Sequence, residues 1–336
     1  MIIGVTGGSG FVGRMLLAKL VERGYDCRAL ENKSAVPAHP HITPVKGSLS
    51  NKESLRAFIT PCDVIIHCGG VVAAKSKQTF HTVNTGGTAN MLDVLHDLSD
   101  APDAKDDTKD SIKTDTKKNT KAGDRNKRVL FISSLAARQP HLSPYADSKK
   151  QAEALFAHDA PYGWDILRPP GIYGPTDANT EPLFDLLDHG LSLKLGPKTA
   201  RFSMIYIDDL TEAMIAWIAA EQTTQDVYEI SDGTDNGYSW DEFSRICCAL
   251  PSDRKVREIR FPKWFLRFIA LNAAFYSLFR ADPAFFTLDK IRELSHPDWT
   301  ADETAFARRF DWTPQIQAEQ GLRLTQQWYT QKKHAQ

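Results

Sequence analysis

Short apolar runs alternate with longer amphipathic stretches through the first half of the chain. Runs rich in β-branched residues predict strands, and stretches whose apolar positions recur every three to four residues predict helices. The predicted strands span residues 2–6, 26–30, 42–46, 64–67, 129–133 and 165–168. The predicted helices span residues 11–22, 52–58, 79–98 and 144–158. Because strands that alternate with crossover helices pair in parallel, the pattern predicts an α/β fold with a doubly wound parallel sheet.

The regular alternation ends after residue 168, where prolines become frequent. Strand-like segments at 204–207 and 227–230 flank a predicted helix over 210–220. Residues 1–170 are therefore predicted to form one domain, and residues 171–336 a smaller, mostly helical region that binds the substrate. Part of the segment 202–232 is expected to return to the main sheet.

Residues 101–127 differ in composition from the segments on either side. They mix charges of both signs, contain no aromatic residue and include a single isoleucine. Such a segment buries too little apolar area to offset its ordering entropy, so we predict a disordered insertion within the first domain.

The charge and cysteine content exclude several classes of protein. The chain has 41 basic and 42 acidic residues, and its net charge of -1 offers no electrostatic basis for binding nucleic acid. Its five cysteines, Cys27, Cys62, Cys68, Cys247 and Cys248, are odd in number and form no C-x-x-C pair. This argues against disulfides and a zinc site, and it predicts a reduced, cytoplasmic protein without a metal.

The sequence predicts no integral membrane segment. The opening M-I-I-G-V-T-G-G-S-G lacks the basic and long apolar regions of a secretion signal. The most apolar later stretch, residues 264–279, is interrupted by Arg267 and Asn272 and is shorter than the roughly 20 residues that span a bilayer. We expect this stretch to pack in the core or in a lid, and peripheral contact with a membrane surface is the alternative.

The first predicted strand leads into a glycine-rich turn and then a helix. Glycines let a backbone approach a pyrophosphate closely, and the N-terminus of a helix attracts its charge. Gly8, Gly10 and Gly13 match G-x-G-x-x-G. With Gly7 in place of Gly8, the turn instead matches T-G-x-x-G-x-x-G. Both registers predict a dinucleotide site, with contacts from Gly7, Gly10, Phe11, Val12 and Gly13.

An acidic residue follows the second predicted strand, about 20 residues beyond the glycines. Glu31 is placed to accept hydrogen bonds from the adenosine ribose hydroxyls, and its charge would repel a 2′-phosphate. This favours NAD. Lys33 lies close by and would offset part of the repulsion, so NADP stays an alternative, and an exposed loop charge is the other interpretation of Glu31.

A tyrosine and a lysine lie four residues apart in S-P-Y-A-D-S-K-K. Ser143 suits the cap of a helix and Pro144 its first position, so Tyr145 and Lys149 are predicted on one helix face. Pairs with this spacing also occur on exposed surfaces. The spacing alone therefore does not identify a catalytic pair.

The glycine turn and Tyr145-x-x-x-Lys149 together resemble the extended branch of the short-chain dehydrogenase/reductase superfamily. This branch is the NAD-dependent epimerase/dehydratase family, which includes 3β-hydroxysteroid dehydrogenase-like members. Residues 63–70, 83–92, 131–137 and 167–175 are similar to further family segments, in the same order. The resemblance implies a Rossmann-type fold and a catalytic set of Ser134, Tyr145 and Lys149. It also implies cofactor contacts from Ser48, Leu49, Cys68, Gly69, Gly70, Tyr145, Lys149 and Pro169.

The residue types suit acid–base chemistry at a carbonyl. Lys149 would lower the pKa of Tyr145 from its usual value of about 10 and bind the nicotinamide ribose, while Ser134 would hold the substrate oxygen. Leu135 and Ala136 stand where dehydratases of the family carry Asp-Glu, which argues against elimination of water. Gly171 replaces an asparagine that contacts the substrate in nucleotide-sugar enzymes.

We therefore predict an NAD(P)-dependent oxidoreductase that interconverts a small-molecule secondary alcohol and a ketone, with Tyr145 as acid and base. The first alternative is a nucleotide-sugar epimerase with the same residues, in which Arg201 could contact a substrate phosphate; a surface charge is the favoured interpretation of Arg201. The second is a dinucleotide-binding sensor or assembly protein without turnover. The family resemblance implies a homodimer that pairs the helices 79–98 and 144–158.

Overall fold

The computed structural model describes residues 1–100, 127–252, 254–261 and 287–334. The predicted insertion lies outside the described residues except for Lys127, whose ammonium donates to the carbonyl oxygens of Ile59, Thr60 and Cys62. The predicted apolar helix over 264–279 also lies outside them. No helix in the described part of the chain is long and apolar enough to cross a membrane.

Seven parallel strands form the central sheet, in the order β11-β6-β5-β4-β1-β2-β3. They are β1 (Ile2–Thr6), β2 (Asp26–Glu31), β3 (Ile42–Lys46), β4 (Val64–His67), β5 (Arg128–Ile132), β6 (Gly163–Arg168) and β11 (Val227–Glu229). The strand order reverses between β1 and β4, which opens a crevice at the carboxyl ends of these strands. The predicted α/β, doubly wound parallel fold is confirmed.

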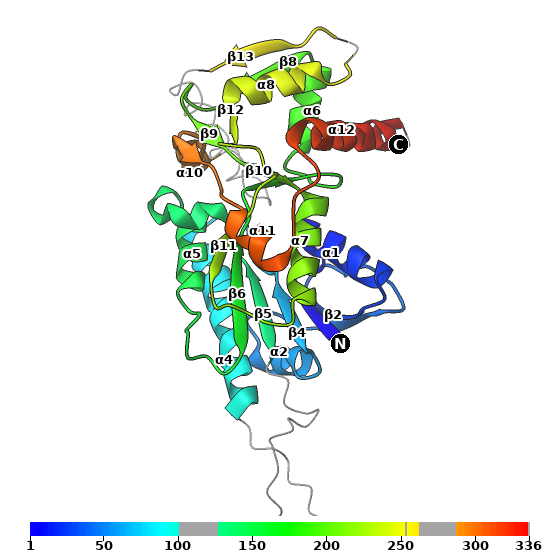
Figure 1. Ribbon diagram of the computed structural model, residues 1–336, viewed down its shortest axis with the longest axis vertical. Helices are drawn as coiled ribbons and strands as arrows, with labels where there is room; N and C mark the ends of the chain where they lie inside the picture. The colour runs from blue at the N-terminus through cyan, green and yellow to red at the C-terminus, as the bar shows by residue number, and fades with distance from the viewer. Residues whose placement is uncertain (101–126, 253, 262–286, 335–336) are drawn as a thin grey trace, which may run out of the picture.

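Helices cover both faces of this sheet (Figure 1). On one face lie α1 (Phe11–Glu22) and α7 (Ile207–Ala219), and on the other α2 (Lys52–Ile59), α4 (Gly86–Asp100) and α5 (Pro144–Glu153). Two separate apolar cores result, because the strands bury alternate side chains on opposite faces. Ile3 and Leu17 belong to the first core, and Ile65 and Met91 belong to the second.

Several predicted helices have different bounds in the structure: α7 begins at Ile207 rather than at residue 210, and two others differ more. The helix predicted over 144–158 ends at Glu153, because the chain then turns to pack Phe156 between the rings of Phe131 and Trp164. The helix predicted over 79–98 is three segments: α3 (Lys77–Phe80), a π-helical turn (His81–Thr85) and α4. A π-turn adds a residue to the helical repeat and often marks a functional site.

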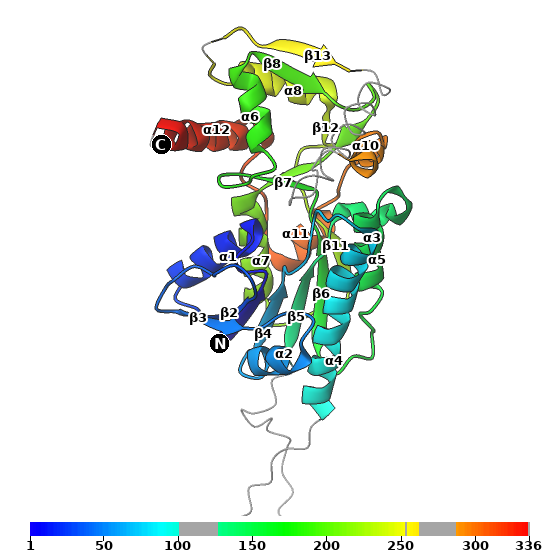
Figure 2. The same cartoon turned by 180° about the vertical axis from the view of Figure 1, so that it is seen from behind.

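The smaller part of the chain lies above the carboxyl ends of the sheet in Figure 1 and is seen from behind in Figure 2. It pairs short strands two or three at a time: β7 (Gly171–Tyr173) with β10 (Met204–Tyr206), β8 (Leu191–Lys194) with β13 (Arg257–Arg260), and β9 (Arg201–Phe202) with β12 (Tyr238–Ser239) and β14 (Asp298–Trp299). Its helices include α6 (Glu181–Asp188), α8 (Trp240–Ala249), α10 (Leu288–Leu294) and α12 (Ala318–His334), while α11 (Thr304–Phe310) packs on α7.

Candidate active site

The glycine turn after β1 packs against the backbone that follows β4. Gly7 has a φ of 73°, and a Cβ there would lie 2.9 Å from backbone atoms of Cys68 and Gly69. Gly8 instead faces the Leu17 side chain. The backbone conformation therefore requires glycine at position 7, which favours the register that begins with Gly7.

Helix α1 begins immediately beyond this turn. A Cβ on Gly13 would lie 2.2 Å from the Gly7 carbonyl oxygen, so only glycine lets the helix start this close to the turn. Gly10 caps the helix without a side-chain hydrogen bond, and the first turn has no acidic residue. Phe11 and Val12 pack against the first core. A helix N-terminus reached through a bare backbone turn fits the pyrophosphate of a dinucleotide.

Several other predicted cofactor residues lie around the same crevice. The backbone N–H of Gly69 donates to the Thr6 hydroxyl over 3.0 Å, and a Cβ on Gly69 would lie 3.2 Å from the Leu49 side chain. A Cβ on Gly70 would lie 2.9 Å from the Asn84 side-chain oxygen. The structure thus brings together the ends of β1 and β4 and the segment after β3.

Ser48 and Cys68 are two further predicted cofactor residues in this region. Ser48 bonds through its hydroxyl to Ser50 over 2.9 Å. Burial raises the pKa of Cys68 to about 12, so this thiol is protonated near neutral pH.

Glu31 ends β2 beside the crevice, but its carboxylate already has protein partners. It accepts hydrogen bonds from the Lys46 ammonium, its register partner on β3, and from the Val36 backbone N–H at 3.0 Å. The hydrogen bond from Lys46 lowers the pKa of Glu31, so the group is ionised at neutral pH. Lys46, which the sequence pattern did not reveal, is therefore the cation that pairs with Glu31. Arg28 points elsewhere and donates to the Ala57 carbonyl oxygen.

The structure brings Ser134 and Tyr145 together. Ser134 follows β5 and caps a 3-10 turn (Leu135–Arg138), accepting from the Ala136 N–H at 3.2 Å. Tyr145 is the second residue of α5, whose N-cap Ser143 accepts from the Ala146 N–H at 3.0 Å. Burial raises the pKa of Tyr145 to about 12; interaction with the Ser134 side chain lowers it, and the Glu293 charge raises it.

Lys149 lies one helical turn beyond Tyr145, and its ammonium donates to the Ile132 carbonyl oxygen at 2.7 Å rather than to the phenol. The same ammonium lies 4.3 Å from the centre of the Phe131 ring. Burial lowers the pKa of Lys149 to about 8. With Lys149 bonded to Ile132, burial decides the direction of the Tyr145 pKa shift, which is upward. The lowering of this pKa by Lys149 stays a prediction for the enzyme with its cofactor bound.

Asn84 is a site residue that the sequence analysis did not single out. Its side chain accepts from the Val71 N–H at 2.8 Å and donates to the Ser148 hydroxyl at 2.9 Å, linking the loop after β4 to the helix that carries Tyr145. It lies within the π-turn, which explains why a regular helical pattern concealed it. The available signal was its place in the family-like segment V-N-T-G-G-T.

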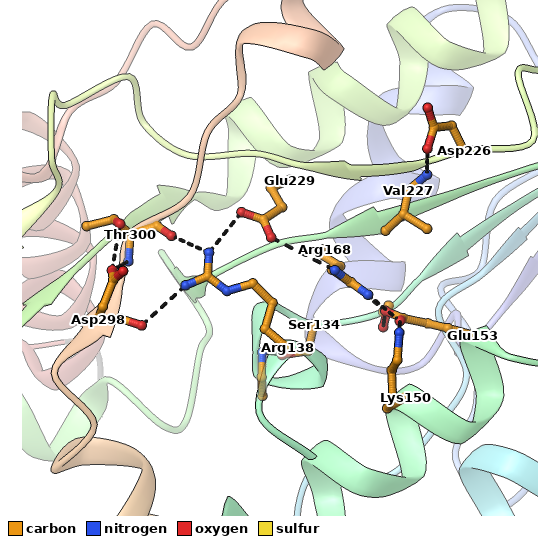
Figure 3. Close-up of polar contacts among 12 residues, drawn as sticks. Ser134, Arg138, Lys150, Glu153, Arg168, Asp226, Val227, Glu229, Asp298 and Thr300 are labelled. Atoms are coloured by element: carbon orange, nitrogen blue, oxygen red, sulfur yellow. Dashed lines mark hydrogen bonds and ion pairs between the residues drawn. The ribbon is translucent and has the colours of Figure 1, made fainter. Parts of the chain in front are cut away.

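A chain of ionic contacts supports the strand that leads to Ser134 (Figure 3). Glu153 accepts from Arg168 at 2.8 and 2.6 Å and from the Ser133 hydroxyl at 2.6 Å. Arg138, one turn beyond Ser134, donates to Glu229 at 3.2 Å. It also donates to the Thr300 carbonyl oxygen at 2.8 Å. The contacts tie the ends of β5, β6, β11 and α5 together.

Pro169 and Arg201 have backbone partners of their own. The Pro169 carbonyl oxygen accepts from the Leu135 N–H at 2.9 Å, which fixes the turn after Ser134. Arg201 donates to the carbonyl oxygens of Asn236 and Gly237 at 2.6 and 2.8 Å. Its guanidinium is thus engaged in joining β9 to β12.

Comparison with known proteins gives relatives along the whole chain. A model for the NAD dependent epimerase/dehydratase family matches residues 3–231. The chain is 31% identical over 312 residues to a ceramide reductase of Caulobacter vibrioides, covering 91% of this chain and 88% of that one. It is 27% identical over 339 residues to a 2-alkyl-3-oxoalkanoate reductase of Stenotrophomonas maltophilia, covering 96% and 98%. A UDP-glucose 4-epimerase of Thermotoga maritima has the same fold, with a TM-score of 0.69 at 17% identity and 99% of each chain covered.

Proposed function

This chain belongs to the NAD dependent epimerase/dehydratase family, and we propose that it reduces a ketone on a lipid-like substrate to a secondary alcohol. Membership confirms the resemblance to the extended short-chain dehydrogenases/reductases. The protein is accordingly an NAD-dependent oxidoreductase that interconverts an alcohol and a ketone. The direction of the reaction and the nature of the substrate are the proposed parts.

Two full-length relatives support a lipid-like substrate. One is named a ceramide reductase and the other a 2-alkyl-3-oxoalkanoate reductase, so both names denote reduction of molecules with alkyl chains. The residues after Ser134 agree with this chemistry, because Leu135 and Ala136 offer no acid or base for elimination. Two residues give little support to a nucleotide sugar as substrate. Gly171 has no polar side chain to contact a sugar, and the Arg201 guanidinium already donates to the carbonyl oxygens of Asn236 and Gly237.

The observation that carries the proposal is that the Ser134 and Tyr145 side chains meet at the carboxyl end of the sheet. Burial raises the pKa of Tyr145 to about 12, so its phenol holds a proton at neutral pH. In our proposal the Ser134 hydroxyl donates a hydrogen bond to the substrate carbonyl oxygen, and Tyr145 transfers its proton to that oxygen. Bound NADH supplies the hydride that the carbonyl carbon accepts.

The glycine turn would hold the dinucleotide. The N–H groups of Phe11 and Val12 at the start of α1 would face the pyrophosphate, and the backbone of Cys68, Gly69 and Gly70 would line the nicotinamide side. Ser48 and Leu49 would border the adenine. Glu31, with Lys46 beside it, would contact the adenosine ribose and favour NAD over NADP.

A substrate screen tests the proposed reaction. Consumption of NADH is followed by absorbance with 3-oxoacyl amides, 3-oxo acids, sterol ketones and nucleotide sugars side by side. We expect turnover with the acyl ketones and loss of turnover in Tyr145→Phe, with NAD affinity nearly unchanged. Turnover of a nucleotide sugar without net NADH consumption would instead establish an epimerase. Equal cellular function of wild type and Tyr145→Phe would establish a protein without turnover.

The oligomeric state and the location are further parts of the proposal. A homodimer would pair the helical segments 79–98 and 144–158 across a two-fold axis, and the reduced cysteines are consistent with the cytoplasm. Sedimentation that shows only monomer at micromolar concentration would contradict the dimer.

A further inference from the structure

Glu293 reaches the N-terminal end of the catalytic helix α5 from the smaller part of the chain. Its helix α10 contacts the 3-10 turn (Pro140–Leu142) that precedes the catalytic helix α5, and both views place α10 beyond the N-terminal end of α5 (Figures 1 and 2). One carboxylate oxygen of Glu293 accepts from the Ser143 hydroxyl at 2.5 Å. Ser143 caps the helix two residues before Tyr145, so the carboxylate is anchored at the N-terminal end of the catalytic helix.

The packing holds Glu293 in this position. Its side chain is 12% exposed, and the Trp299 indole N–H donates to the Glu293 backbone carbonyl oxygen at 2.8 Å. The second carboxylate oxygen accepts from Lys290 on the same helix at 3.1 Å. Because Lys290 is 41% exposed, solvent screens its charge and it offsets only part of the negative charge of Glu293.

The charge of Glu293 acts on the reacting centre. It contributes to the raised pKa of Tyr145, after burial. Lys149, the cation of the catalytic set, points instead to the Ile132 carbonyl oxygen at the end of β5. A fixed negative charge thus lies close enough to the Tyr145 phenol to act on it electrostatically.

We propose that Glu293 is a specificity-determining residue. It favours substrates with a neutral N–H or O–H donor beside the reacting ketone and disfavours substrates with a carboxylate there. The inference rests on the proposed ketone reduction and narrows it, because a 3-oxoacyl amide then becomes a better substrate than a 3-oxo acid of the same chain length. Each carboxylate oxygen keeps a lone pair for a substrate donor, whereas a second carboxylate would meet a like charge.

The experiment compares one 3-oxoacyl amide with the 3-oxo carboxylate of equal chain length, in wild type and in Glu293→Gln. Glutamine keeps an acceptor for Ser143 and removes the charge. We expect wild type to have a kcat/KM about tenfold higher for the amide. Repulsion between the Glu293 carboxylate and a substrate carboxylate in a partly solvated site costs about that factor. Glu293→Gln should bring the two values of kcat/KM within about threefold of each other.

Two further variants separate charge from structure. Glu293→Asp keeps the charge and should keep the preference for the amide. Asp289→Asn removes one negative charge from the same helix at a residue paired with Arg292, and it should leave the preference unchanged. Calorimetric affinities for the corresponding 3-hydroxy amide and 3-hydroxy carboxylate should follow the same order, which adds a readout independent of turnover.

The outcomes distinguish this inference from the proposed function. If wild type reduces both ketones with no preference, or if Glu293→Gln retains the wild-type preference, Glu293 only docks α10 and the inference is wrong. If wild type reduces neither ketone, the proposed function fails and the inference fails with it. A preference for the amide that disappears in Glu293→Gln and persists in Asp289→Asn supports both.

Discussion

Removing Arg168 should destabilise the protein more than removing one partner of an exposed ion pair. The side chain of Glu153 is 3% exposed and that of Arg168 is 14% exposed, and two parallel hydrogen bonds of 2.8 and 2.6 Å join them. Figure 3 shows this pair and its contacts. Arg168→Met keeps the apolar stem but leaves the carboxylate of Glu153 buried without its strongest partner.

The magnitude follows from the desolvated carboxylate. Breaking a buried ion pair by deleting one partner costs about 3–5 kcal/mol, because the remaining charge has lost its water without compensation. Replacing both charges with apolar groups avoids that cost. The triple variant Arg168→Met, Glu153→Leu and Ser133→Ala, which also removes the hydroxyl that donates to Glu153, should recover at least half of the loss.

Urea unfolding at neutral pH, followed by tryptophan fluorescence, measures these free energies. Arg323→Met is the matched control, because Arg323 pairs with Glu319 at 3.5 Å and their side chains are 50% and 67% exposed. We expect a loss below about 0.5 kcal/mol for the control. A triple variant less stable than Arg168→Met alone would refute the reasoning, since it would mean that the uncompensated charge is not the cause of the loss.

Three further predictions test the cofactor site and the catalytic lysine. Gly13→Ala should abolish NAD binding in a fluorescence titration, because its Cβ would lie 2.2 Å from the Gly7 carbonyl oxygen; unchanged affinity would contradict the tight turn. NAD should bind about tenfold to a hundredfold more tightly than NADP, and Glu31→Ala should narrow that gap while Lys46→Met widens it; tighter binding of NADP by wild type would show that a cation reads the phosphate. Burial lowers the pKa of Lys149 from 10.5 to about 8. The unfolded state therefore binds the Lys149 proton more tightly than the folded state, and the contribution of Lys149 to the free energy of unfolding rises with pH between about 8 and about 10. The difference in unfolding free energy between wild type and Lys149→Met should therefore shift in favour of wild type across that range, and a constant difference would contradict the lowered pKa.

Local patterns were sufficient for much of the architecture. The strand Ile2–Thr6 and the helix Phe11–Glu22 have the predicted bounds, because an apolar run, a glycine turn and an amphipathic period lie in one continuous segment. The choice between the Gly7 and Gly8 registers required the structure. It depended on how closely the turn approaches Cys68 and Gly69, which are some 60 residues away in sequence.

Long-range packing decided where elements end and which side chains meet. Helix α5 stops at Glu153 because Phe156 enters the core between Phe131 and Trp164, a contact that no local period contains. The pairing of Glu31 with Lys46 follows from the register of two parallel strands.

Tyr145 and Lys149 lie on one helix, as predicted, but their partners belong to segments distant in sequence. The carbonyl oxygen of Ile132 on β5 accepts a hydrogen bond from Lys149. Glu293, which lies 150 residues from Ser143 in the sequence, accepts one from the Ser143 hydroxyl. A sequence alone determines which groups a chain can offer for chemistry, through residue type and local spacing. The charge and water around those groups depend on segments distant in sequence, because burial and Coulomb forces act through space, and only the tertiary structure supplies that arrangement.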